Sequence, residues 1–159
     1  MTVRHHYVLD LADVGAFRLL RREDVTVRSP TRDDHGALAE LMLDAYRGTI
    51  DYEGEGIEEA VAEVAGHFDG APIDEASTLA LIDDEPVAAC LVARYDGDAL
   101  VGYVMTVPAF KRQGLGRAVT AASLVELQKL GYGTVHAWIT EGNKPSESIF
   151  VGLGFEVVD

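Results

Sequence analysis

Segment 104–119 carries the residue types that bind a phosphate group. An apolar stretch ends at Pro108, a loop without acidic residues follows, and a helical pattern begins near Leu115. The first N–H groups of a helix lack intrahelical partners and carry partial positive charge, so they attract an anion. Gly114 and Gly116 let the backbone approach that anion without a Cβ in the way. A pyrophosphate-binding loop is therefore predicted, with positive charge from Lys111, Arg112 and Arg117.

The glycine spacing excludes two common nucleotide-binding loops. A Walker loop needs a glycine, four residues and then Gly-Lys-Ser or Gly-Lys-Thr, and the chain has no such run. A dinucleotide-binding loop needs a third glycine where Val119 stands. An ordinary glycine-containing turn between a strand and a helix stays open as the alternative.

Two motifs in the C-terminal half follow one another in a recognisable order. The first reads Lys111-Arg112-Gln113-Gly114-Leu115-Gly116 after Thr106-Val107-Pro108. The second begins with Asn143-Lys144-Pro145-Ser146 and ends with Leu153-Gly154-Phe155. Together they resemble the acetyl-CoA loop and the last helix of the GNAT superfamily of acyl-CoA N-acyltransferases. The resemblance covers residues 25–158, although that family usually has Gln or Arg at the position of Lys111 and Val at that of Thr106.

The resemblance implies an α/β fold and an acetyl-CoA site. The expected fold is a GNAT-like mixed, mostly antiparallel central sheet with helices on both faces and a splayed parallel strand pair, here 99–107 and 134–140. The pantetheine arm of acetyl-CoA would lie in the gap between these two strands. The expected donor-binding residues are Met105, Thr106 and Val107 on the strand, Lys111, Arg112, Gln113, Gly114, Leu115, Gly116 and Arg117 in the loop, and Asn143, Ser146 and Phe150 beyond it.

Periodicity predicts the elements that position these motifs. Strands are expected at 78–82, 87–95, 99–107, 134–140 and 155–158, and helices after the capping pair Thr31 and Asp34, at 57–68, at 115–130 and after Asn143. Two helical faces are expected to be buried: Ile57, Ala60, Val61, Val64, Ala65 and Phe68, and Leu115, Ala118, Val119, Ala122 and Val125.

The N-terminal segment 1–28 has a weaker pattern. It predicts a strand or a hairpin from His6–Asp10 and Val25–Arg28, with an irregular piece at Phe17–Leu20. Many members of the resembled family have a further C-terminal strand, and this segment is expected to fill that edge of the sheet. Residues 1–159 are expected to form a single acyl-CoA N-acyltransferase domain.

Charge and composition limit the classes of partner. The chain has 27 acidic and 13 basic residues, a net charge of −14, which disfavours nucleic acid and anionic membranes and attracts cations. Solubility alone is the plainer reason for such acidity. No apolar run reaches the roughly 18 residues of a membrane span, and no secretory signal is visible, so a cytoplasmic location is expected. Cys90 lies in an apolar run and predicts a buried side chain, while the five histidines show no metal-ligand spacing.

The acceptor site is expected between the first two helices and their connecting loop. Six acidic residues and no basic residue occur from Asp51 to Glu63. The helical ones also fit the solvated face of an amphipathic helix, so the loop residues are the better candidates. The residues expected to bind a cationic amine are Tyr46, Asp51, Tyr52 and Glu53.

The resembled family transfers an acyl group directly from a thioester to an amine, which requires a neutral amine, oxyanion stabilisation and a route for the thiolate. Glu141 is the candidate base because it ends the strand beside the gap, although a solvated loop carboxylate is the plainer reading. His136 is a second candidate to face the site, but a structural role for this histidine is the favoured interpretation. An N–H at Thr106 or Val107 would stabilise the oxyanion. The family often has a tyrosine as general acid where Phe150 stands, so the thiolate either leaves unaided or takes its proton from Tyr103, Ser146, Ser148 or water.

The leading hypothesis is an N-acetyltransferase that moves an acetyl group from acetyl-CoA to a small cationic amine or an amino-acid-like substrate. Two alternatives stay open: a transferase acting on protein lysines or N-termini, and a non-catalytic acyl-CoA-binding sensor, which Phe150 motivates. A plain phosphate-binding domain is a more distant alternative. The oligomeric state is also open, a homodimer included.

Overall fold

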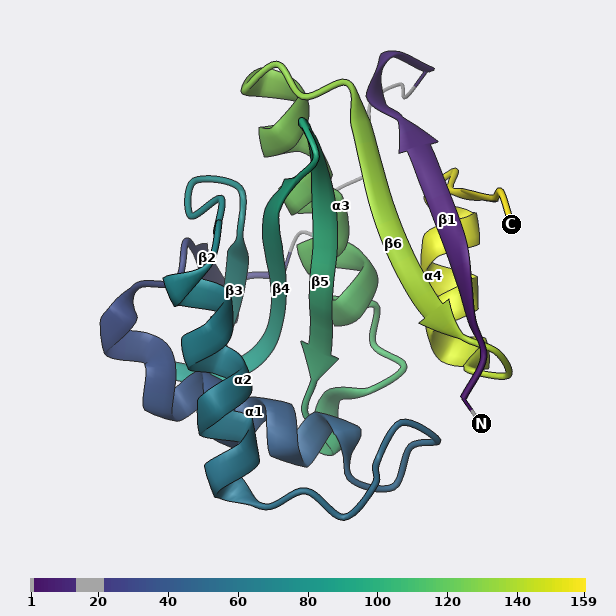
Figure 1. The fold of residues 1–159 in the computed structure, drawn as a ribbon. Coiled ribbons are helices and arrows are strands. Elements are labelled where there is room, and N and C mark those ends of the chain that lie inside the picture. Colours follow the sequence, from purple (N-terminus) through teal and green to yellow (C-terminus); the bar gives the residue numbers. More distant parts are fainter. Residues whose placement is uncertain (1, 14–21) are drawn as a thin grey trace.

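Seven strands form one sheet in a computed structural model that describes residues 2–13 and 22–159 (Figure 1). The sheet order is β2-β3-β4-β5-β6-β1-β7. Its strands are β1 (Arg4–Asp10), β2 (Val25–Arg28), β3 (Thr78–Ile82), β4 (Glu85–Tyr95), β5 (Asp98–Thr106), β6 (Thr134–Thr140) and β7 (Glu156–Val157). Every neighbouring pair is antiparallel except β5 and β6, which confirms the predicted mixed sheet.

Helices cover both faces of this sheet, as predicted (Figure 1). The helices are α1 (His35–Tyr46), α2 (Ile57–Asp69), α3 (Leu115–Lys129) and α4 (Lys144–Gly152), with short 3-10 turns at Leu11–Asp13, Arg32–Asp34 and Pro108–Phe110. One buried cluster packs α1 and α2 against β3–β5, and a second packs α3 and α4 against the other face. Within the described residues, no helix is long and apolar enough to cross a membrane.

The parallel strands β5 and β6 separate soon after they meet. Their only paired positions are Ala99 with Val135 and Leu100 with His136, whereas β5 continues beside β4 to Thr106. The register of β4 and β5 shifts at Gly102, which lies opposite no residue of β4. Such a bulge bends a strand, and this one lies where the two strands diverge. From Val101 onward, the edge of β5 that faces β6 therefore has no partner strand.

The N-terminal segment supplies two separate strands rather than a hairpin. β1 pairs with β6 on one side and with β7 on the other, so it extends the sheet beyond β6. β2 pairs with β3 at the opposite edge. β1 and β2 are thus not paired with each other, and the predicted irregular piece at Phe17–Leu20 lies outside the described residues.

Two predicted helix faces need correction. On α2, Ile57 and Val61 are exposed rather than buried. On α3, the buried side also includes the hydroxyl residues Thr120 and Ser123, while Ala118, Ala122 and Val125 are only half-buried. Thr120 donates a hydrogen bond to the Gly116 carbonyl, and the hydroxyls of Ser123 and Thr78 lie 2.9 Å apart. Because these hydroxyls are satisfied internally, polar residues occupy a face that a hydropathy pattern assigns to solvent.

Candidate active site

A cavity of about 1080 Å³ lies where β5 and β6 separate. Its floor is the stretch of β5 from Leu100 to Val104 and of β6 from Ala137 to Thr140. Residues of α1 and α2 line it on one face of the sheet, and Asn143, Ser146 and Phe150 line it from α4 on the other. The separation of the strands therefore connects the two faces of the sheet through one cavity.

The predicted pyrophosphate loop ends in the geometry of an anion cradle. Arg112 and Gly114 both have left-handed backbone conformations, with φ of 67° and 79°, so the chain turns sharply into α3. The first bond of the helix ladder runs from the Ala118 N–H to the Gly114 carbonyl over 2.9 Å. The N–H groups of Leu115, Gly116 and Arg117 precede that ladder and point outward from the helix start.

Gly116 has a packing role that the sequence pattern did not reveal. A Cβ at this position would lie 3.2 Å from Ile149 Cδ1 and 3.2 Å from Thr106 Oγ1. The missing side chain therefore lets α3 pack closely on β5 and α4. Leu115 and Met105 are likewise core side chains, so only their backbone groups remain for a ligand.

The cationic side chains of the loop differ in direction. Lys111 Nζ donates to the Ala45 carbonyl over 2.9 Å and so binds the C-terminal end of α1 rather than the loop. Arg112 and Arg117 are exposed and have no ion pair among the described residues. Gln113 Oε1 accepts from Arg22 at 3.0 Å. Arg112 and Arg117 are therefore the charges left to meet an anion at the start of α3.

The backbone of β5 decides which N–H group can face the gap. The Val107 N–H donates to the Val87 carbonyl over 3.0 Å, so it is already used by β4. N–H directions alternate along a strand, which directs the Thr106 N–H toward β6. Of the two predicted oxyanion donors, Thr106 thus has the free group and Val107 does not.

Comparisons with known proteins agree with this geometry. Residues 81–159 match the family described as FR47-like protein, and no curated protein matches the chain significantly. The chain belongs to the GNAT superfamily. A GCN5-related N-acetyltransferase from Sphaerobacter thermophilus is similar in structure, with a TM-score of 0.77 and 17% identity over 98% of this chain and 48% of the other.

Two further solved structures are similar. The ribosomal-protein-S18-alanine N-acetyltransferase from Escherichia coli has a TM-score of 0.70 and 18% identity, covering 85% of this chain and 79% of its own. The PaiA N-acetyltransferase from Thermoplasma acidophilum, solved with coenzyme A, has a TM-score of 0.68 and 17% identity, covering 85% and 91%. The chain spans about half the length of the Sphaerobacter protein, so that comparison concerns the fold of one half of it.

In this GNAT chain, Asn143 joins the start of α4 to the loop between α1 and α2 across the cavity. Its Oδ1 accepts from the Ser146 N–H over 3.3 Å, which caps α4 as predicted. Its Nδ2 donates to Asp51 Oδ2 over 2.9 Å. One side chain therefore fixes both the start of α4 and the loop between α1 and α2.

The predicted acceptor residues divide into two groups. Tyr46, Asp51 and Tyr52 line the cavity, whereas Glu53 does not. Three acids on or just before α2, which the amphipathic pattern assigned to solvent, line it as well: Glu55, Glu59 and Glu63. The ion pairs of the described residues involve none of these carboxylates or Asp51. The α2 side of the cavity is thus a wall of carboxylates without an ion-pair partner, and Arg4 on β1 is the one Lys or Arg side chain among the described residues that line the cavity.

Glu63 and Tyr103 form a pair across the cavity wall. Tyr103, on β5, donates a hydrogen bond from its hydroxyl to the Glu63 carboxylate on α2. Burial and this hydrogen bond raise the pKa of Tyr103, which stays protonated throughout the neutral range. The sequence singled out Tyr103 only as one of several hydroxyls and gave no sign that Glu63 meets it.

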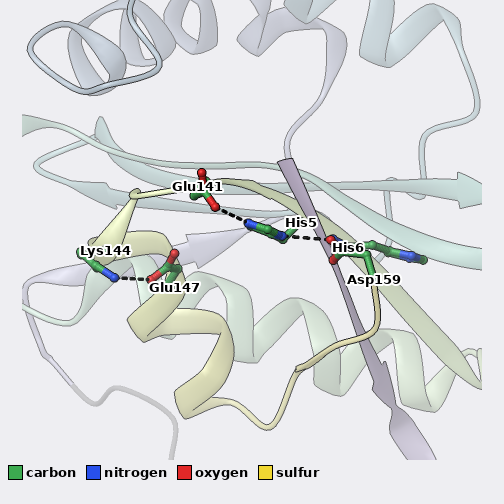
Figure 2. Close-up of polar contacts among 6 residues, drawn as sticks. All are labelled: His5, His6, Glu141, Lys144, Glu147 and Asp159. Carbon is green, nitrogen blue, oxygen red and sulfur yellow. Dashed lines mark hydrogen bonds and ion pairs between the residues drawn. The ribbon is translucent and has the colours of Figure 1, made fainter. Parts of the chain in front are cut away.

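Glu141, the candidate base, lies outside the cavity. Its Oε1 is 3.1 Å from His5 Nε2, and Asp159 Oδ2 is 2.9 Å from His5 Nδ1 (Figure 2). The Glu141 side chain is 65% exposed and does not line the cavity. The structure thus gives this carboxylate a partner on β1 and places it outside the lining of the cavity.

The other candidates are placed as follows. His136 does not line the cavity and instead lies 2.7 Å from Asp98 through Nε2. Phe150 lines it, is 5% exposed and packs edge-on against Phe155. Cys90 is buried, and burial raises the pKa of its thiol to about 11, so the thiol stays protonated at neutral pH. The described residues hold no group of His, Cys, Asp or Glu side chains arranged to share a metal ion.

Proposed function

We propose that this chain is an acetyl-CoA-dependent N-acetyltransferase whose acceptor is a small cationic amine. The observation that carries the proposal is the cavity that joins the strand gap to a wall of carboxylates, none of which forms an ion pair with another described residue. A thioester reaching the gap would meet an ammonium group attracted to that wall. The net charge of −14 also attracts a cationic acceptor before it reaches the cavity, because the electrostatic field extends beyond direct contacts.

The donor side fits the pyrophosphate and pantetheine of acetyl-CoA. The N–H groups at the start of α3 would hold the pyrophosphate, with Arg112 and Arg117 beside them. The unpaired edge of β5 offers backbone groups to the amide-bearing arm, as an added strand would. Coenzyme A in the Thermoplasma structure supports this use of the fold.

Proton transfer is assigned to the acceptor wall. Amide formation releases one proton from the attacking amine, and the departing thiolate takes up one. An alkylamine with a pKa of about 10.4 is almost wholly protonated at neutral pH. Glu63 would accept the proton that the ammonium group must lose before it attacks, directly or through one water, and Tyr103 would orient the carboxylate. A thiol with a pKa of about 8.5 leaves readily enough that the missing hydroxyl at Phe150 does not prevent the reaction.

The test is release of free thiol from acetyl-CoA by the purified protein, with and without added amines. The panel contains alkyl diamines, polyamines, basic amino acids and a peptide with a free N-terminal alanine. That peptide is included because the Escherichia coli neighbour is named for such a substrate. Amine-stimulated release supports the proposal. Saturable acetyl-CoA binding without release under any amine would overturn it and favour a sensor.

A further inference from the structure

Trp138 is a half-exposed aromatic side chain at the edge of the cavity. It is the only tryptophan in the chain, is 46% exposed, and lines the cavity from β6. Its neighbours Ala137 and Ile139 belong to the core beneath α3 and α4, so Trp138 points to the opposite face of the sheet. That face is the one that carries α2 and its carboxylates.

A column of rings holds the indole in place. His6, opposite Trp138 on β1, stacks on it with the ring centroids 4.2 Å apart and the planes 9° from parallel. His136 stacks on His6 in turn, with its Nδ1 2.8 Å from His6 Nε2. Asp98 lies 2.7 Å from the other nitrogen of His136, and Tyr95 contacts the same ring. The indole therefore packs on its β1 side against His6, which contacts His136, which in turn contacts Asp98.

The other face of the indole is directed toward the strand gap. β1 flanks β6 on one side, and His6 covers that side of the ring. On the other side, the pairing of β5 with β6 ends at Leu100 and His136, so no β5 residue pairs with Trp138. Among the described residues, His6 is the only ring stacked on Trp138. An indole stacked on His6 thus borders the same cavity as the carboxylates of α2.

We propose that Trp138 is a specificity-determining residue of the acceptor site, whose indole receives a cationic group by a cation–π contact. The inference rests on the proposed function for its reaction, and it deepens that function by adding an aromatic wall to the acidic one. Tryptophan is the strongest aromatic partner for a cation, and the contact strengthens when the pair is shielded from water. Carboxylates on one wall and an indole on the other suit an alkylammonium rather than a neutral amine.

The single tryptophan makes binding directly observable. The fluorescence of the intact protein is titrated with choline and, as a matched probe, with 3,3-dimethylbutan-1-ol, which has the same shape without the charge. We expect choline to change the Trp138 emission saturably and the neutral alcohol to have at least about 3-fold lower affinity. Equal affinities, or no saturable change with choline, would overturn the proposal whether or not the protein transfers acetyl groups.

Kinetics of three variants provide the second test, with whichever amine the transfer assay identifies. Trp138→Leu should raise the acceptor KM about 3- to 30-fold and leave the acetyl-CoA KM unchanged. Trp138→Phe, which keeps a π-face, should raise it less. Tyr95→Leu is the control, because Tyr95 contacts the same column and does not line the cavity. An acceptor KM that is unchanged by Trp138→Leu, or raised equally by all three, would refute the contact while leaving the transferase assignment intact.

Discussion

Asn143 and Asp51 are joined by a hydrogen bond of 2.9 Å that connects the cap of α4 to the loop between α1 and α2. The two residues are far apart in the chain and lie on opposite sides of the strand gap. Asn143 uses its oxygen as the acceptor of the helix cap and its nitrogen as the donor to Asp51, so one amide makes both contacts. The loop that we propose to bind the acceptor is thus held by the start of α4.

Asn143→Ala and Asn143→Asp separate the two contacts. The alanine variant loses both and should lower the free energy of unfolding by about 1 kcal/mol, the usual value of a helix cap. The aspartate variant keeps the cap but places a carboxylate against Asp51, so it should lose less stability and yet raise the acceptor KM at least as much. Urea unfolding and steady-state kinetics measure the two effects. If the acceptor KM instead rose more in the alanine variant, in proportion to its larger loss of stability, the contact with Asp51 would have no functional role of its own.

Removing a carboxylate that lines the cavity should weaken acceptor binding more than removing one that does not. Asp51→Asn and Glu63→Gln should each raise the acceptor KM about 5-fold or more, since each removes roughly 1 kcal/mol of attraction for an ammonium group. Glu63→Gln should also lower kcat, because the proton acceptor is lost. Glu53→Gln is the matched control, as Glu53 does not line the cavity. Equal effects of all three changes would show that only overall charge matters.

Local patterns predicted most of the helices, strands and turns because these elements depend on residues that are close together in the sequence. Thr31 and Asp34 form the expected capping pair, with the Thr31 N–H donating to Asp34 over 2.7 Å. The strand at 134–140 and the turn at Gly154, with φ of 106°, are also as expected. The family motifs then supplied the splayed parallel pair, which no local pattern contains, whereas the order of the strands in the sheet came only from the structure.

The features that sequence reasoning missed depend on contacts between distant segments. Glu63 and Glu59 satisfy the period of a solvated helix face, and only the position of α2 over the strand gap brings them into a cavity. Glu141 was chosen by its place at a strand end, but His5 lies beside it because β1 pairs with β6. A glycine inside a strand is a known sign of a bulge, so Gly102 is the one missed feature that the sequence itself could have indicated.

Gly116→Ala tests whether α3 must lie close to β5. A new Cβ would be within 3.2 Å of atoms on both Thr106 and Ile149, so neighbours must shift, at a cost of about 1–3 kcal/mol in stability. Gly36→Ala in α1 is the control, because a Cβ there meets nothing within 4 Å and alanine favours a helix by up to about 1 kcal/mol. Thermal unfolding should thus move in opposite directions for the two variants. A neutral Gly116→Ala would show that the loop and helix adjust freely.

Two histidines should give stability opposite pH dependences. Hydrogen bonds to Asp159 and Glu141 raise the pKa of His5 above 6.5, so its contribution is complete below that value and is lost as the pH rises through the folded-state pKa. Burial lowers the pKa of His67 below 6.5, and His35 adds to the effect while Asp74 opposes it. Only the neutral form of His67 is compatible with burial. Its contribution to stability is therefore fully present above pH 6.5 and is lost as the pH falls below that value.

Urea unfolding from about pH 5 to about pH 8.5 can resolve the two groups, since each acts on its own side of the histidine range. His5→Gln should flatten the loss of stability on the alkaline side and leave the acid side unchanged. His67→Gln should flatten the acid side, because the unfolded chain no longer gains a proton that the folded chain excludes. If His5→Gln instead altered the acid side, the contact with Asp159 and Glu141 would not be holding a proton on His5. The backbone bonds would then hold these segments together without His5: Glu141 N–H to the Val3 carbonyl, Val158 N–H to the His6 carbonyl, and His6 N–H to the Asp159 carboxylate.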